Sequence, residues 1–448
     1  MRRKRKCYLL FVTVWVFLLV GQIKTGRAAD TDSAFQVDLP TAVARALQEN
    51  PEVQAKRHTL GLATGRVQQA ELLFQDNPRV SIEADYRNRR FRAPTGRSIA
   101  DAEVSLLQEV EIAGQRGHRQ QAATTHLRYT ERVIADAERL LQLAVIRTFY
   151  ELLAAQERIQ AQQHIVHTRD GLLQAGRERF AQEDISVLEF DTLRLDTDQA
   201  RTRLLTTQQE HVLAEKQLQL LLGTSAGKPL VAVGDLFKTS GQPALPEPLP
   251  SPEELTACAL EQRPDYQAAR LKVATQEAEL RLARANRIPN ISLGPMYKLD
   301  NEDQVVGAAL TIPLPLFNRN AHEITAAMAN VEIARRELQA RTLAVQHEVA
   351  ATYTRLQLAE QQRAVYGKNY LDKIAQSDDF PQQAYTAGEV SIFEFSVALD
   401  RLTQARSRAV DAALTTLQAR AEFAAQLAFR CLTTDAQEEI RDAYDTNP

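Results

Sequence analysis

The sequence repeats itself once along its length. The segment Ser186-Val187-Leu188-Glu189-Phe190 recurs 205 residues later as Ser391-Ile392-Phe393-Glu394-Phe395. Earlier in each copy, Asn50-Pro51-Glu52 corresponds to Arg263-Pro264-Asp265. A repeated sequence predicts a repeated fold. We therefore expect each half to contain, in order, a helix, two short strands, a very long helix, a turn and a second long helix.

A proline-rich segment, residues 223–251, separates the two copies. Its five prolines are Pro229, Pro243, Pro246, Pro248 and Pro250. Neither a helix interior nor a central strand accepts proline. We interpret 223–251 as a linker between a first repeat, 30–222, and a second repeat, 252–430, followed by a C-terminal tail, 431–448.

Few residues in the chain interrupt helices. Glycine and proline number 17 each among 448 residues, well below the average of about 12% for the two together. Between 118 and 180 there is no proline, and the apolar stripe advances in alternating steps of three and four residues, as in a coiled coil. The stripe consists of Ile134, Ala137, Leu141, Ala144, Thr148 and Leu152. We predict helices over 118–180, 187–222, 320–384 and 391–430; the first would be roughly 95 Å long.

Four segments alternate polar and apolar residues, as a strand with one apolar face does. They are 79–91, 99–112, 290–299 and 304–312. In the first two, the polar positions include the acids Glu83, Asp85, Asp101 and Glu103. A strand of about ten residues is long enough to cross a membrane in a tilted barrel. We predict barrel strands; the alternative is a small soluble hairpin lying on a helix.

The first 29 residues have the composition of an export signal. Basic residues at 2–6 precede an apolar run of 13 residues, Tyr8 to Val20, and small residues precede Asp30. A membrane-spanning helix needs about 20 apolar residues, so this run is short for one. We expect a signal peptide at 1–29; the alternative is a retained N-terminal anchor.

Charge and cysteine content restrict the possible partners. The formal net charge is −3, and without 1–29 there remain 47 basic and 57 acidic residues, a difference of −10. Phosphate binding needs a basic face, so we expect no nucleic acid partner. Beyond the signal the cysteines are Cys258 and Cys431. They either form one disulfide or remain two separate buried thiols.

Together, the repeat, the strand pairs, the long helices and the signal resemble the TolC family of outer-membrane efflux channels, over about 39–428. The resemblance implies an α+β membrane protein. Each protomer would supply four β-strands and long antiparallel coiled-coil helices. Three protomers would complete a twelve-stranded outer-membrane β-barrel and continue it as a periplasmic α-barrel. Because four strands leave two open edges, which lipid does not tolerate, a homotrimer is expected.

The segment after the second predicted strand is similar to a signature of the heavy-metal (CzcC-like) branch of that family. It reads Glu111-Ile112-Ala113-Gly114-Gln115-Arg116, and Ala113 and Gln115 depart from the Glu-Leu-Gly-Gly-Lys-Arg pattern. Its copy in the second half is Pro313-Leu314-Pro315-Leu316-Phe317-Asn318-Arg319. The similarity marks Glu111, Gly114 and Arg116 as family signature residues.

The turns between the paired helices resemble the family motif Tyr-x-x-Gly-x-x-Ser/Thr-x-x-Asp/Glu. The second turn carries the whole motif, as Tyr385, Gly388, Ser391 and Glu394. In the first turn Ser186 and Glu189 remain, while Phe180 and Glu183 replace the tyrosine and the glycine. In the family these tips close the periplasmic entrance, which implies that the matching residues form the aperture and contact the adaptor.

The same residues also allow a purely structural interpretation. A serine followed three residues later by glutamate forms a capping box at a helix N-terminus, as Ser391 and Glu394 would. In addition, Val390 stands where the family has an arginine. The family's ionic latch therefore does not carry over with the motif.

The sequence shows no catalytic site. It has neither a Gly-rich phosphate loop nor a nucleophile elbow, and His322-Glu323 and His347-Glu348 lack the second histidine of a zinc protease motif. His164 and His167 share a helical face, but two histidines without a third ligand are more often ordinary helix surface. We expect no enzyme activity, no cofactor and no metal site.

The resemblance implies the passive exit duct of a tripartite efflux system. Its partners would be a periplasmic adaptor protein, an inner-membrane RND-type pump and outer-membrane lipid. The acids on the polar strand face and the signature favour divalent heavy-metal cations as cargo, although such acids also simply keep a water-facing wall wet. Drug efflux or type I secretion through the same kind of duct is the alternative. A periplasmic coiled-coil adaptor or scaffold, and a periplasmic enzyme, are more remote.

Overall fold

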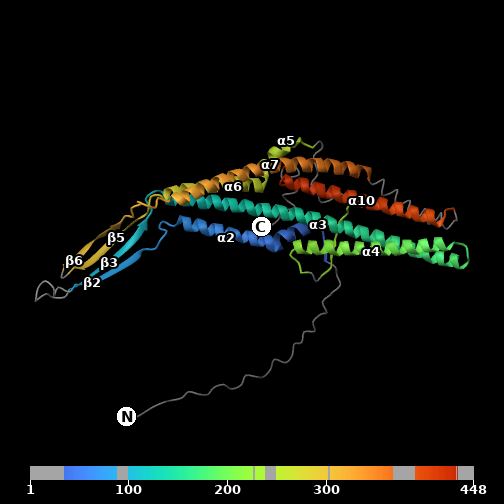
Figure 1. Cartoon of the computed structure of the whole chain (residues 1–448), viewed down its shortest axis with the longest axis horizontal. Coiled ribbons are helices and arrows are strands. Elements are labelled where there is room, and N and C mark those ends of the chain that lie inside the picture. The colour runs from blue at the N-terminus through green and yellow to red at the C-terminus, as the bar shows by residue number, and fades with distance from the viewer. Residues whose placement is uncertain are drawn as a thin grey trace, which may run out of the picture.

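The chain forms a long rod with a β-sheet at one end and helices along the rest of its length (Figure 1). The computed structural model describes residues 35–87, 99–225, 228–237, 249–300, 303–366, 389–429 and 431. The expected signal peptide and the motif residues Tyr385 and Gly388 lie outside these residues. Within the described part, no helix is both long enough and apolar enough to cross a membrane.

Four long helices run along the rod. They are α3 Gln115–Ala181, α4 Val187–Leu221, α7 Ala321–Val365 and α10 Ile392–Gln426. With 67 residues, α3 is about 100 Å long. It begins three residues before the expected start, and the predicted continuation of α7 from 367 to 384 lies outside the described residues.

Shorter helices complete each half. They are α1 Leu39–Glu49 and α2 Pro51–Glu71 in the first half, and α5 Pro252–Gln262 and α6 Pro264–Ala285 in the second. Asn50 and Arg263 occupy the two breaks, each in an extended conformation before a proline that starts the next helix. The break is forced because a residue before proline disfavours the helical conformation.

The sheet contains four antiparallel strands in the order β2-β3-β5-β6. They are β2 Arg79–Arg87, β3 Ile99–Val110, β5 Ile291–Asp300 and β6 Asp303–Thr311. Each half contributes one hairpin, and β3 pairs with β5 to join the two halves. Gly294 of β5 is needed at this seam, because a Cβ there would lie 1.7 Å from the carbonyl oxygen of Leu106.

The proline-rich segment is not only a linker. Its residues Leu230–Ala232 form strand β4, which pairs in parallel with β1, Phe35–Val37. Leu230, Ala232 and Leu236 join the largest apolar cluster, which also includes Phe149 of α3. The prolines argue against a helix or a central strand, but β4 belongs to a two-stranded sheet and falls between Pro229 and Pro243, where the backbone is free to pair.

Candidate functional site

The two faces of the four-stranded sheet differ in chemistry. Large apolar side chains occupy one face of all four strands and are exposed, up to 81% for Val306. They are Val80, Ile82, Val104, Leu106, Leu293, Tyr297, Leu299, Val306 and Leu310. The strand register places them opposite one another, as in Ile82 opposite Val104. An exposed apolar face this continuous indicates a surface that meets lipid or protein.

The opposite face carries the predicted acids, and the register brings them together. Glu83 lies opposite Glu103, and Asp85 lies opposite Asp101. Like charges directly opposite each other destabilise a sheet. On the other side of Glu103, β5 places Lys298. This neighbour was missed in the sequence because it depends on β3 pairing with a strand from the second half.

The signature segment forms the joint between the sheet and α3. Gly114 has φ +72°, a left-handed conformation that suits glycine, and directly precedes the helix. Gln115 is buried, and its side-chain amide donates to the carbonyl oxygen of Ile288 at 3.0 Å and to Asn290 Oδ1 at 3.2 Å. These contacts tie the start of α3 to the connection that leads into β5.

Two charged signature residues strengthen the same joint. The guanidinium of Arg116 donates to the carbonyl oxygen of Glu71, at the end of α2, at 2.9 Å. Glu111 and Arg119 form an ion pair, and both side chains are largely buried. The signature therefore contacts both α2 and the start of α3, where the strands give way to helices.

At the opposite end of the rod, both motif copies form capping boxes. In the first, the backbone N–H of Ser186 donates to Glu189 Oε2 at 2.8 Å, and the N–H of Glu189 donates to Ser186 Oγ at 3.2 Å. In the second, the corresponding distances between Ser391 and Glu394 are 2.8 and 3.3 Å. The capping interpretation describes both helix starts; Glu394 is exposed and Glu189 is half-buried.

The caps change the acidity of both glutamates. Hydrogen bonds donated by the backbone and side chain of Ser186 hold the pKa of Glu189 below its ordinary value, and the nearby charge of Arg179 lowers it further. The same bonds from Ser391 lower the pKa of Glu394. Glu183, which replaces the motif glycine in the first turn, has φ +63°. The first turn therefore keeps the left-handed backbone conformation at this position, although the residue is a glutamate and not a glycine.

An ion cluster around a buried arginine near these tips was not predicted from the sequence. Arg169 of α3 is buried and donates to Asp400 Oδ1 at 2.7 Å and to Ser396 Oγ at 3.3 Å, both on α10. The nitrogen that donates to Ser396, Nη1, also lies 3.1 Å from Asp196 Oδ2 on α4. One cation therefore joins α3, α4 and α10. Apolar residues of the same three helices, among them Leu172, pack together there.

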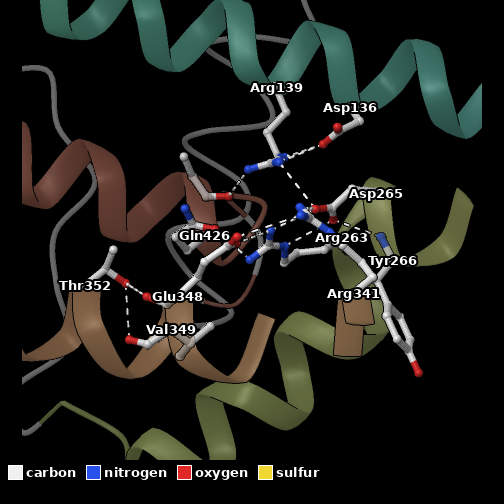
Figure 2. Close-up of polar contacts among 11 residues, drawn as sticks. Asp136, Arg139, Arg263, Asp265, Tyr266, Arg341, Glu348, Val349, Thr352 and Gln426 are labelled. Carbon is white, nitrogen blue, oxygen red and sulfur yellow. Dashed lines mark hydrogen bonds and ion pairs between the residues drawn. The ribbon is translucent and has the colours of Figure 1, made fainter. Parts of the chain in front are cut away.

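A second ion cluster, drawn in Figure 2, joins helices of both halves. The guanidinium of Arg263 is fully buried and donates to Asp265 at 3.1 and 2.8 Å, to Glu348 at 2.6 Å and to Gln426 at 2.6 Å. It thereby joins the start of α6 to α7 and α10. Removing one partner of such a buried group costs more than the pair contributes, so the cluster fixes how these helices are placed.

Two further arginines complete this cluster. Arg139 of α3 donates to Asp136 at 2.7 Å and to the carbonyl oxygen of Ala425 at 3.1 Å, and it lies 3.7 Å from Asp265. Arg341 of α7 forms an ion pair with Asp265, and partial burial lowers the pKa of its guanidinium. Four helices from both halves therefore meet around Asp265 (Figure 2).

The structure pairs the two cysteines and places one of the two histidines in a groove. Cys258 of α5 and Cys431 form a disulfide that closes a separation of 173 residues. His164 lines a groove of about 560 Å³ between α3, α4 and α10. Among the described residues, no three side chains of the types that ligate metals come together.

Solved structures share this fold. CusC aligns with a TM-score of 0.70 and 18% identity, covering 88% of this chain and 93% of that one. The Campylobacter jejuni outer-membrane channel CmeC aligns with a TM-score of 0.71 and 15% identity, covering 91% and 89%. The fold is therefore one found in outer-membrane channel proteins.

The sequence itself identifies the family. The family model described as "Outer membrane efflux protein" matches residues 42–224 and 255–428, and the chain belongs to this family. The cobalt-zinc-cadmium resistance protein CzcC of Cupriavidus metallidurans is 23% identical over 397 residues, 87% of this chain and 90% of that protein. These findings confirm the expected family resemblance and a location in the outer membrane. The family consists of efflux proteins, not enzymes.

Proposed function

We propose that three copies of this chain form one exit duct across the outer membrane and the periplasm. The four-stranded sheet supports this assembly most directly. It has an exposed apolar face, an acidic face and two edge strands, β2 and β6. Open edges are unstable in lipid, and joining three sheets edge to edge closes them in a twelve-stranded barrel with the apolar face outward.

The helices extend this barrel as a tube. The helices pack side by side along their lengths. With 67 residues, α3 is by itself long enough to reach far into the periplasm. We expect this tube to be passive. Transport through it would then depend on an inner-membrane RND-type pump, joined to the tube by a periplasmic adaptor protein. The adaptor would contact the hairpin ends at Ser186, Glu189, Ser391 and Glu394, together with Tyr385 and Gly388.

The same hairpin ends would form the aperture. Glu394 and Glu189 are carboxylates in the first turn of their helices, the first exposed and the second half-buried. Three copies would bring several like charges to the narrow end of the tube. Val390 stands where the family has an arginine, so other residues would have to hold the helices together at the tips. Arg169 makes contacts of this kind, as ion pairs with Asp196 and Asp400.

The cargo that fits best is a divalent heavy-metal cation. Glu83, Asp85, Asp101 and Glu103 form two rows of acids on the face that would line the barrel, and the similarity to CzcC points the same way. Charges in a wide pore are screened beyond about 8–10 Å, so these acids bias cation traffic without selecting one metal. Drug efflux or type I secretion is the second candidate, because the fold itself is shared.

Deleting the gene tests the cargo. We expect cells to become more sensitive to zinc, cobalt, cadmium, copper or nickel ions than to hydrophobic drugs. Normal metal tolerance with sharply increased drug sensitivity would overturn the metal proposal and leave the duct intact. Complementation with a variant in which Glu83 and Glu103 are changed to glutamine tests whether the acid rows contribute.

Proline in the barrel wall tests the assembly. Val104→Pro removes a backbone donor from β3 and should abolish the heat-modifiable trimer band in detergent-extracted outer membranes. Val104→Ala is the matched control and should retain it. A normal trimer from Val104→Pro would contradict the barrel and favour a periplasmic scaffold.

A further inference from the structure

The connections between the sheet and the helices expose very different amounts of apolar surface. Nine large apolar side chains are exposed in the four connections. Seven of them belong to the connections of the edge strands, which are residues 72–78 before β2 and residues 312–320 after β6. These seven are Leu72, Leu73, Phe74, Ile312, Leu314, Leu316 and Phe317. The two inner connections expose one each, Ile112 and Ile288.

The connection before β2 is held in place by its neighbours. The side-chain amide of Gln108, on β3, donates to the carbonyl oxygen of Asp76 at 3.0 Å. Arg116 holds the carbonyl oxygen of Glu71, directly before Leu72. These contacts fix both ends of the three exposed apolar residues.

The connection after β6 is held in a similar way. Asn320 donates from its side chain to the carbonyl oxygen of Ala283, on α6, at 3.0 Å. Within the segment, the N–H of Leu316 donates to the carbonyl oxygen of Leu314 at 2.9 Å. Two prolines, Pro313 and Pro315, restrict the remaining backbone. Phe317 is nevertheless fully exposed, so an apolar surface is preorganised for a partner.

The sheet order shows what such a partner is. β2 begins and β6 ends at the helical end of the sheet, and these two strands are its opposite edges (Figure 1). When sheets join edge to edge, β6 of one copy lies beside β2 of the next. The connection after β6 then lies next to the connection before β2 of the neighbouring copy, at the same level of the rod.

We propose that these two connections bind each other in neighbouring copies. Leu72, Leu73 and Phe74 of one copy would pack against 312–317 of the next, forming an apolar collar where the barrel meets the helical tube. The proposal rests on the edge-to-edge assembly proposed above and names the surface that completes it. A lipid-binding belt would need apolar residues around the whole circumference, whereas seven of the nine lie at the edges.

Cysteine cross-linking in outer membranes tests the collar. Two double variants, Leu73→Cys with Leu316→Cys and Phe74→Cys with Phe317→Cys, should give covalent dimers and trimers on oxidation that reductant reverses. The matched control, Ile112→Cys with Ile288→Cys, places cysteines on the inner connections and should give no bands between copies. Each single variant should stay monomeric on denaturing gels.

The outcomes separate the collar from the assembly. If the heat-modifiable trimer forms but neither edge pair cross-links, the collar is wrong and the barrel stands. If the unmodified chain forms no trimer, both fail. In addition, Phe317→Ser should lower the temperature at which the trimer band converts to monomer, while Ile112→Ser should leave it unchanged. Equal effects of the two variants would overturn the collar.

Fluorescence tests the lipid alternative. The chain has one tryptophan, Trp15, which lies in the expected signal peptide. Phe317→Trp therefore provides a single reporter in the exported chain. In vesicles containing brominated phospholipids, we expect its emission to match that in unbrominated vesicles. Strong quenching would place Phe317 in lipid and overturn the collar.

Discussion

Arg169 and Asp400 are joined by a hydrogen bond of 2.7 Å although 231 residues separate them in the chain. The bond connects α3 of the first half with α10 of the second. Because Arg169 also lies 3.1 Å from Asp196 on α4, a single buried cation connects three helices near the proposed aperture. The strength with which α10 is held there should affect how far the tips separate.

Replacing this cation should loosen the tips. In Arg169→Met, Asp196 and Asp400 lose their shared partner, and we expect a loss of roughly 1–3 kcal/mol in the free energy of unfolding. The resting conductance in planar bilayers should increase. Arg201→Met is the control, because Arg201 makes exposed ion pairs with Asp170 and Asp198, which contribute about 0–1 kcal/mol. If Arg169→Met and Arg201→Met have the same stability and the same resting conductance, Arg169 plays no part in the proposed aperture.

Variants of Glu394 separate charge from capping. Glu394→Gln removes the negative charge but keeps an oxygen that can accept from Ser391, whereas Glu394→Ala removes both. If the carboxylates control the aperture, both variants should increase the resting conductance and weaken the preference for cations in planar bilayers. A change only in Glu394→Ala would assign this residue to helix capping alone.

Acid should weaken both caps. The pKa values of Glu189 and Glu394 are lowered in the folded chain by hydrogen bonds from their serines. Stabilisation of this kind is complete above the unfolded pKa, about 4.3, and is lost as the pH falls through the lower, folded pKa. We expect hydrogen-exchange protection factors at 186–190 and 391–395 to decrease at pH values below about 4. Glu189→Ala and Glu394→Ala should each abolish this dependence at their own cap, and its persistence there would contradict the assignment.

Loss of the disulfide should destabilise the chain. Cys258 and Cys431 are 173 residues apart, so the chain-entropy model gives a contribution of up to about 5 kcal/mol. The double variant Cys258→Ser with Cys431→Ser should therefore unfold at a lower temperature. Reductant should lower the unfolding temperature of the unmodified chain to the same value and leave the variant unchanged. An unmodified chain that resists reductant would show that the bond contributes little.

The long helices and the strands could be predicted because each is encoded locally. Steps of three and four residues from Ile134 to Leu152 define the helical stripe, and two-residue alternation defines the strands. Glu83 and Glu103 lie opposite each other within one hairpin, so their pairing depends only on neighbouring sequence. The short strand β4 was missed because Leu230–Ala232 is too short to show alternation and lies beside Pro229.

The ion clusters could not be predicted, since no local pattern encodes them. Arg139 and the carbonyl oxygen of Ala425 are 286 residues apart, and Arg263 and Glu348 are 85 apart. Each arginine appears in the sequence as one charge among many on a helix. Only the packing of both halves shows that these side chains are buried. Similarly, the signature around Gln115 indicated a family, and its contacts with Ile288 became visible only in the fold.

The two helix breaks have a consequence for the symmetry of the proposed tube. In the first half, the side chain of Asn50 joins the break to α4 by a neutral hydrogen bond of 2.9 Å to the carbonyl oxygen of Leu221. In the second half, Arg263 joins the equivalent break to its neighbours through charges. Around a ring of three copies, neutral and ionic joints would alternate, so the ring has threefold but not sixfold symmetry. Any distortion that loosens one kind of joint before the other would then act at every second position, and the tube would deform into a triangular rather than a circular outline.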